Sequence, residues 1–325
     1  MKTLVTGGAG FIGSHLVDEL IDNGHTVIIV DDLSGSNGEY LSPYARFIQA
    51  DCRDEKEMDR IFKTHTPEVV FHLAANAAEN KAQFSPIDVT SRNYDAFIKV
   101  LTPFIKYGGK RFVYTSSVAV YGSLQIPFKE TDIPQPEDLY GINKLAAEQT
   151  LAVMSKVHGF EYVITRPHNV YGPRQYMQDP YRNVVTIWMN NALRNEPITV
   201  YGDGTMKRCF SYIKDVVAPL CRCGFEEVTG MTFNIGSDLV YQISELADAI
   251  DTNVKLTRTY LPKREQEVQD AVSDHTLLRE KLGYHETSLH EGIRKTWLWA
   301  KEKGAQEPIY TEIEIQSKKL PKNWK

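Results

Sequence analysis

The chain has 325 residues, of which 42% are hydrophobic and 24% are charged, and its formal net charge at pH 7 is −5. This composition is typical of a globular protein in water, and the negative charge argues against general nucleic-acid binding, which needs a basic surface. No apolar run approaches the roughly 20 residues of a membrane-spanning helix, and the opening stretch MKTLVTGGAGFIGSHL lacks the layout of a signal peptide.

The cysteines predict the redox environment. No Cys-x-x-Cys pair occurs in the sequence, so we expect free thiols in a reducing cytoplasm, without disulfides and without a metal site. The four are Cys52, Cys209, Cys221 and Cys223.

Strand-like and helix-like segments alternate through the first half of the chain. Runs rich in Val and Ile predict strands at 3–7, 25–32, 46–51, 68–75, 111–117 and 162–172. Amphipathic stretches between them predict helices at 11–23, 54–64, 87–107 and 140–158. This alternation is typical of parallel strands covered on both faces, so we expect an α/β fold with a doubly wound parallel sheet of the Rossmann type.

The alternation ends after residue 173, where the segments become irregular and are interrupted by Pro and Gly. We expect a smaller C-terminal α/β lobe there, with a ligand in the crevice outside the carboxyl ends of the strands. The predicted units are residues 1–175, to which the chain returns near 205–235, and residues 176–325. The tail, EPIYTEIEIQSKKLPKNWK, is open to two interpretations: a flexible end, or an edge strand in a lid or dimer contact.

A glycine-rich motif, TGGAGFIG, follows the first predicted strand and opens the first predicted helix. Glycines at 7, 8, 10 and 13 permit a tight turn and a close approach of the backbone to a pyrophosphate, which then lies at a helix N-terminus. The alternative is a plain turn between strand and helix. We expect a dinucleotide to contact Gly7, Gly10, Phe11, Ile12 and Gly13.

Two carboxylates, Asp31 and Asp32, end the second predicted strand, close to the offset at which an acidic residue binds the adenosine ribose. A carboxylate there repels a 2′-phosphate, so the sequence favours NAD over NADP. For Asp32 a solvated loop position is the alternative. The pair Asp51 and Cys52 ends the third predicted strand, where the adenine edge is expected.

The pentapeptide YGINK places Tyr140 and Lys144 four residues apart, on one face of a predicted helix. An ammonium beside a phenol stabilises the phenolate, so the phenol could accept a proton near neutral pH. With 17 tyrosines in the chain, one such match can also arise by chance as a surface pair. The surrounding motifs have to decide between these interpretations.

Taken together and in order, the motifs resemble the extended short-chain dehydrogenase/reductases, and among them the nucleotide-sugar epimerase/dehydratase family. They are TGGAGFIGSH, DDLSGS at 31–36, HLAA at 72–75, YTSSVAVYG at 114–122, YGINK, RPHNVYGPRQ at 166–175, YGDGTMKRCFSYIKDV at 201–216 and KRE at 263–265. The glycine motif alone is a weak signal, whereas the ordered set covers most of the chain.

The resemblance assigns roles to the YGINK and TSS residues. It implies that Tyr140 is the catalytic acid/base, and that Lys144 binds the nicotinamide ribose and lowers the pKa of the tyrosine. Ser117 would bind the sugar hydroxyl that loses its proton, with Ser116 as the alternative. The further cofactor residues it implies are Ser34, Gly35, Ser36, Leu73, Ala74, Ala75, Asn93, Pro167 and His168.

The same resemblance implies a set of substrate residues. Asn169, Arg208 and Arg264 would hold the diphosphate of a nucleotide-sugar, since two arginines suit two phosphates. Tyr201 would pack on the nucleobase. Three positions depart from the family pattern: Cys209, Gln266 and His168, which we expect to be a buried, hydrogen-bonded histidine rather than a second base.

The two residues after Ser117 indicate the reaction. Related 4,6-dehydratases carry an acid pair there, but this chain has Val118 and Ala119, which transfer no proton. The resemblance therefore implies an NAD-dependent 4-epimerase that passes through a 4-keto sugar, on a UDP-hexose or its N-acetyl or uronic derivative. The small Ala271 aligns with a bulky pocket residue and would leave room for such a substituent.

Two alternatives stay open. The first is a nucleotide-sugar 4-dehydrogenase or ketoreductase that exchanges NAD(H), and the second is a non-catalytic nucleotide-sensing protein. The second is disfavoured because the chain keeps the Tyr, Lys and Ser residues together. The family also implies a homodimer.

Overall fold

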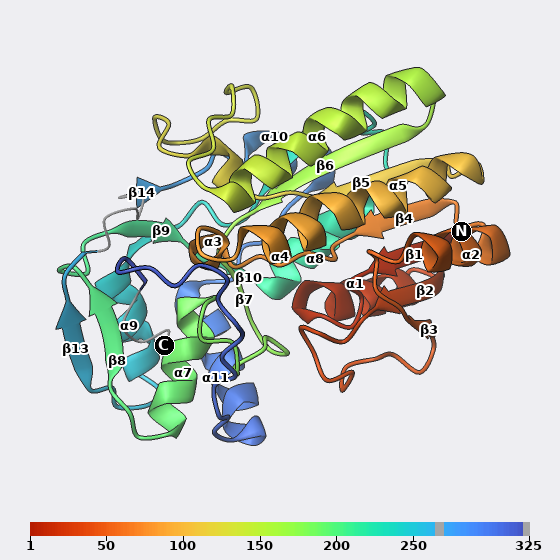
Figure 1. Ribbon diagram of the computed structural model, residues 1–325. Coiled ribbons are helices and arrows are strands. Elements are labelled where there is room, and N and C mark those ends of the chain that lie inside the picture. The colour runs from red at the N-terminus through yellow and green to blue at the C-terminus, as the bar shows by residue number, and fades with distance from the viewer. Residues whose placement is uncertain (264–269, 321–325) are drawn as a thin grey trace.

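The computed structural model describes residues 1–263 and 270–320 and is built around a twisted sheet of seven parallel strands (Figure 1). The order across the sheet is β11-β6-β5-β4-β1-β2-β3. This arrangement confirms the predicted doubly wound Rossmann sheet, in which the strand order reverses beside β1. The strands are β1 (Lys2–Thr6), β2 (Thr26–Asp31), β3 (Arg46–Gln49), β4 (Val69–His72), β5 (Arg111–Thr115), β6 (Glu161–Pro167) and β11 (Thr232–Ile235).

Helices cover both faces of the sheet because successive strand residues point to opposite sides. Leu4 packs in a core with α2 (Glu55–His65), α5 (Ala96–Lys106) and α6 (Leu139–His158). Its neighbour Val5 packs in the other core, with α1 (Phe11–Asp22) and α8 (Ile213–Arg222). Strands buried on both faces explain the nearly continuous apolar runs in the sequence.

The second core continues into a smaller lobe, so the lobe is packed on the sheet through shared apolar contacts. α8 and β11 bring the chain back to the sheet between segments of this lobe. Its helices are α7 (Val184–Leu193), α9 (Ile243–Asp251), α10 (Thr276–Leu282) and α11 (Leu289–Lys303). Its strand pairs join β7 (Val170–Tyr171) to β10 (Ser211–Tyr212), β8 (Ile198–Tyr201) to β13 (Arg258–Leu261), and β9 (Lys207–Cys209) to β12 (Val240–Gln242) and β14 (Asp270–Ala271).

Two predicted elements are interrupted. The helix expected at 87–107 consists of α4 (Pro86–Thr90), a π-helical turn η1 (Ser91–Asp95) and α5, and a short α3 (Glu79–Ala82) precedes it. The strand expected at 162–172 divides into β6 and β7, because Asn169 between them adopts a positive φ of 41° that no strand permits. π-helical turns are rare and frequently mark functional sites.

The tail after α11 runs from the smaller lobe to the region of α3 and α4 instead of adding a strand to a sheet (Figure 1). The Ile309 N–H donates to the Gln178 carbonyl at 2.8 Å, and the Ile315 N–H donates to the Phe84 carbonyl at 2.8 Å. Ile313 is buried beside Phe84 and Tyr181. Within the described part of the chain, no helix has both the length and the apolar character needed to cross a membrane.

Candidate active site

A cavity of about 450 Å³ lies at the carboxyl edge of the sheet, where open α/β sheets bind ligands. Its walls come from the residues that follow β1, β2, β3, β4 and β5, from the end of β6 and from the loop before α7. The predicted cofactor residues in the wall are Gly7, Gly10, Phe11, Ile12, Gly13, Asp31, Asp32, Ser34, Gly35, Asp51, Cys52, Leu73, Ala74, Ala75, Tyr140, Lys144 and Pro167; of the predicted substrate residues, Ser117 and Asn169 line it.

The glycine motif forms a tight turn that only glycine permits. Gly7 has a φ of 70°, and a Cβ on Gly13 would lie 2.1 Å from the Gly7 carbonyl oxygen. The N-terminus of α1 has no side-chain cap, and its first residues line the cavity. Backbone N–H groups at a helix start without a side-chain cap fit the pyrophosphate of a dinucleotide.

The two carboxylates after β2 have different partners. Asp31 accepts hydrogen bonds from the Ala9 N–H at 3.0 Å and the Leu33 N–H at 2.8 Å, so it ties the glycine turn to the end of β2. Burial raises the pKa of Asp31. Asp32 accepts from Arg92 at 3.1 Å. Both carboxylates therefore line the predicted ribose position, but each is already engaged by the protein.

The start of α6 positions Tyr140. The Asp138 side chain caps the helix by accepting from the Gly141 N–H at 2.8 Å. A Cβ on Gly141 would lie 2.6 Å from the Ala119 carbonyl oxygen, so glycine lets the helix approach the loop that carries Ser117. The glycine of YGINK thus brings the phenol and the serine together.

Both serines of the TSS motif line the cavity. Ser117 accepts from the Ala119 N–H at 3.1 Å and caps the short 3₁₀ helix at 118–121. The buried Ser116 hydroxyl has no hydrogen-bond partner among the described residues. A buried hydroxyl without a partner, aimed at a cavity, indicates a place for a ligand.

Lys144 is buried one turn after Tyr140 and donates to the Thr115 carbonyl at 2.7 Å. Its ammonium lies 5.7 Å from the centroid of the Tyr140 ring. Burial lowers the pKa of Lys144 to about 7. The sequence predicted a lowered pKa for Tyr140, but in this structure burial raises it, with the negative charge of Glu79 as the second cause and a hydrogen bond to Ser117 opposing it. The prediction is wrong here because burial and the charge of Glu79 both disfavour phenolate, and the hydrogen bond to Ser117 does not offset them.

Sequence reasoning missed the charged residues that share this end of the cavity. Glu79 from α3 and the loop residues Asp179 and Arg182 line it. The Arg182 Nε donates to the Asp179 carboxylate at 2.6 Å, and the charge of Arg182 opposes part of the rise in the pKa of Tyr140. The available signal was a run of charged and aromatic residues, at 176–182, between the RPHNVYGPRQ motif and the next helix.

Three predicted cofactor residues are not among the described residues that line the cavity: Ser36, Asn93 and His168. The Asn93 side-chain amide forms two hydrogen bonds with the backbone of Asn76: it accepts from the N–H at 2.8 Å and donates to the carbonyl at 3.0 Å. Asn93 therefore holds the backbone of the segment after β4 in place and is not itself among the described lining residues. His168 is buried, with its Nε2 hydrogen-bonded to His275.

Tyr201 and Arg208, the predicted substrate residues that the structure describes in the smaller lobe, are not among the residues that line the cavity. Tyr201 ends β8, and Arg208 lies in β9, where its Nη1 donates to the Lys207 carbonyl at 2.8 Å. Arg264 and Gln266 lie outside the described residues. Ala271 packs against the apolar cluster of Val120, Tyr121 and Phe128 rather than lining the cavity.

All four cysteines are buried free thiols. In the described part of the chain, no group of three or more His, Cys, Asp or Glu side chains is arranged to hold a metal ion.

Comparison with known proteins identifies the relatives of this site. The family model described as NAD dependent epimerase/dehydratase family matches residues 3–236. A UDP-N-acetyl-alpha-D-glucosaminuronate decarboxylase from Bacillus cytotoxicus is 32% identical over 93% of this chain and 98% of its own. A UDP-glucose 4-epimerase from Mycolicibacterium smegmatis is 33% identical over 91% of this chain and 97% of its own. The crystal structure of a UDP-glucose 4-epimerase from Thermotoga maritima, solved with UDP-glucose, has a TM-score of 0.88 and 38% identity, covering 93% of this chain and 99% of that one.

Proposed function

The chain belongs to the NAD dependent epimerase/dehydratase family, and from that premise we propose that it is a nucleotide-sugar 4-epimerase acting through a 4-keto intermediate. Its substrate in this proposal is a UDP-hexose or the N-acetyl or uronic derivative of one. The supporting observation is that Ser117, Tyr140 and Lys144 meet at one cavity, while Val118 and Ala119 carry no acid beside them.

NAD is the cofactor, and when bound it supplies the hydride acceptor and donor that oxidation and re-reduction at C4 require. The glycine turn and the α1 N-terminus would hold its pyrophosphate, and Lys144 would bind the nicotinamide ribose. Ser117 orients the O4 hydroxyl of the sugar, and Tyr140 removes the O4 proton as phenolate and returns it as phenol. Tyr140 and Lys144 are both buried, so little water reaches the groups that handle the proton.

The relatives leave one reaction to separate from epimerisation. The Mycolicibacterium and Thermotoga proteins are UDP-glucose 4-epimerases, whereas the Bacillus protein is a decarboxylase of a uronic sugar. Oxidation at C4 serves both reactions. Loss of a C5 carboxyl requires a substrate that carries one, so a UDP-hexose or N-acetylhexosamine can only be epimerised, whereas with a uronic acid the product decides between the two reactions.

The test is proton NMR of the purified protein with a panel of UDP-, GDP-, CDP- and dTDP-sugars, including a hexose, an N-acetylhexosamine and a uronic acid for UDP. A C4 epimer that accumulates to equilibrium without added cofactor supports the proposal. A pentose product would identify a decarboxylase instead. Conversion that requires added NAD(H) in stoichiometric amounts would identify a 4-dehydrogenase or ketoreductase.

We also propose a cytoplasmic homodimer. The buried free cysteines are consistent with a reducing compartment, and a dimer is what the family resemblance implies. Light scattering coupled to size exclusion checks the dimer, and a monomer at micromolar concentration would contradict it.

A further inference from the structure

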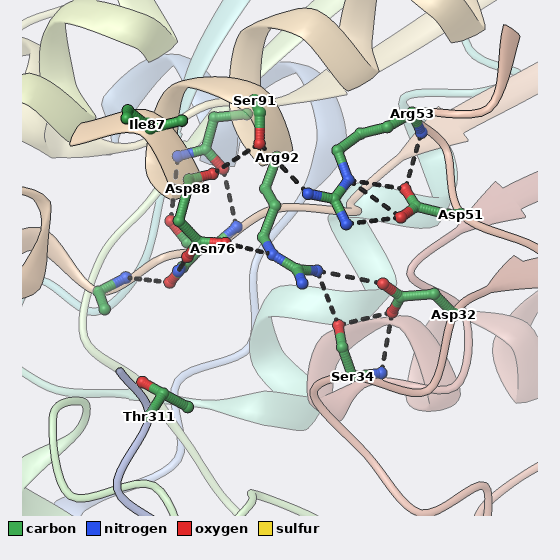
Figure 2. Close-up of polar contacts among 12 residues, drawn as sticks. Asp32, Ser34, Asp51, Arg53, Asn76, Ile87, Asp88, Ser91, Arg92 and Thr311 are labelled. Carbon is green, nitrogen blue, oxygen red and sulfur yellow. Dashed lines mark hydrogen bonds and ion pairs between the residues drawn. The ribbon is translucent and has the colours of Figure 1, made fainter. Parts of the chain in front are cut away.

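An ion pair spans the carboxyl end of β1, beside the glycine turn. Arg92 Nη1 donates to Asp32 Oδ2 at 3.1 Å and to Ser34 Oγ at 3.0 Å (Figure 2). Asp32 follows β2, whereas Arg92 lies in η1, beyond β4. Since β1 lies between β4 and β2 in the sheet, the contact bridges two sides of the cavity, and all three residues line that cavity.

Hydrogen bonds from Arg92 to Asp88, and from Asn76 to Asp88, fix the orientation of the Arg92 side chain. Its Nε donates to Asp88 Oδ1 at 2.8 Å, and Asp88 Oδ2 accepts from Asn76 at 2.8 Å (Figure 2). Arg92 is the second residue of the π-helical turn, which interrupts the regular helix at the cavity wall. Figure 2 shows the guanidinium between the two carboxylates. A planar cation fixed by two carboxylates is oriented far better than one on an open surface.

The C-terminal tail binds the helix that carries Asp88. Glu314 accepts hydrogen bonds from the backbone N–H of Ile87 at 2.9 Å and from that of Asp88 at 2.7 Å. These two residues lie in the first turn of α4, which leads directly into η1. A residue near the end of the chain therefore restrains the helix that presents Asp88 to Arg92.

We propose that Arg92, with Asp32 and Ser34, forms a clasp over the adenosine end of the cofactor site and slows the exchange of NAD. The position of the clasp, beside the glycine turn and at the end of β2, is where a dinucleotide places its adenosine ribose. Release of the nucleotide would require the ion pair to open. The clasp depends on the family's NAD site and not on which sugar the enzyme converts, so it can fail without affecting the proposed reaction.

The charges around Arg92 indicate a non-phosphorylated ribose. Its guanidinium already binds Asp32 and Asp88, and the neighbouring Arg53 is bound to Asp51 at 2.6 Å. A 2′-phosphate would have to displace one of these carboxylates from its arginine. The clasp thus fits NAD better than NADP.

The test compares Arg92→Met and Arg92→Lys with the wild type. The matched control is Arg60→Met, which removes an exposed arginine whose ion pair with Glu57 lies on α2, outside the cavity walls. NAD content after purification is measured by chromatography of the denatured protein, and the release rate is measured by chasing bound NAD with isotopically labelled NAD. Arg92→Met should release NAD about tenfold faster, the scale of one lost charge-assisted contact, Arg92→Lys should be intermediate, and Arg60→Met should match the wild type.

A double-mutant cycle separates the clasp from general damage. Asp32→Asn should also speed release, and Arg92→Met should add little to it, because both variants open the same contact. Equal release rates for Arg92→Met and Arg60→Met would overturn the proposal. Additive effects of Arg92→Met and Asp32→Asn on the NAD release rate would also overturn it. A third contradicting result is an Arg92→Met variant that loses NADP binding while its NAD release is unchanged. Circular dichroism and thermal melting of each variant identify any that fail to fold. In that case the NAD release rate is measured in Glu314→Gln, which weakens the hydrogen bonds from the tail to α4.

Discussion

His168 Nε2 lies 2.9 Å from His275 Nε2, and both imidazoles are buried. A hydrogen bond between two ring nitrogens requires one donor and one acceptor, and His275 Nδ1 lies 2.7 Å from the Asp238 carboxylate on its other side. Burial lowers the pKa of His168 to about 3 and that of His275 to about 4. At neutral pH both imidazoles are therefore uncharged, and their hydrogen bond links the end of β6 to the smaller lobe. This agrees with the expected buried, hydrogen-bonded histidine, although the side chain is not beside the cavity.

The histidine pair predicts acid sensitivity. A neutral buried His275 has a lower pKa in the folded state than the ordinary value near 6.5 in the unfolded state, so the unfolded chain binds the proton first. The free energy of unfolding should fall as the pH drops from about 6.5 to about 4, and His275 should contribute about 3 kcal/mol of that fall. In His275→Gln the loss over this interval, measured by urea unfolding, should be smaller by about that amount. An equally steep loss in the variant would contradict the prediction.

Tyr140→Phe tests the proton transfer. The variant keeps the ring that packs beside Ala82 and Val89 but removes the hydroxyl, so turnover should fall at least about 100-fold, the usual scale for a positioned acid/base. The melting temperature should stay within a few degrees of the wild type. Tyr44→Phe, at a tyrosine that is 83% exposed, is the matched control and should retain full turnover. Near-normal turnover in Tyr140→Phe would remove the phenol from the mechanism.

Gly141→Ala separates helix stability from site geometry. Alanine favours a helix interior over glycine by about 1 kcal/mol, but here the added Cβ would lie 2.6 Å from the Ala119 carbonyl oxygen. The helix start must shift away from the serine loop, which moves Tyr140 relative to Ser117. We expect kcat to fall at least about tenfold. A higher melting temperature with unchanged kcat would show that the serine loop moves to accommodate the Cβ without disturbing the site.

The sequence predicts the parts of this site that depend on local rules. Continuous apolar runs and strand–helix alternation are local, and so the sheet and its glycine turn are confirmed by the structure. The partner of Asp32 is not local, because Arg92 reaches it across β1 only after the whole sheet has assembled. The same holds for His275, which meets His168 from a different lobe. The interrupted helix at 87–107 was missed because a single π-helical turn of five residues carries little weight in an apolar pattern judged over the whole segment.

The tail should influence substrate binding through Thr311. Its hydroxyl accepts from the buried Lys81 ammonium at 2.6 Å, and its carbonyl accepts from the Tyr181 hydroxyl at 3.2 Å. Tyr181 lines the cavity and lies next to Arg182, so the tail connects α3 to one wall of the site.

Thr311→Val removes the acceptor for Lys81 while preserving the shape of the side chain. The free energy of unfolding should fall by about 1–3 kcal/mol, because the buried ammonium loses its short hydrogen bond and keeps the Asp88 carboxylate at 3.9 Å. The Lys81 ammonium also lies 5.6 Å from the centroid of the Tyr181 ring, so its displacement disturbs this wall, and KM for the nucleotide-sugar should rise several-fold while kcat changes little. Thr311→Ser keeps the hydroxyl and should restore both values. If the Val and Ser variants have the same KM, the tail does not act on the site through Thr311, whatever their stabilities.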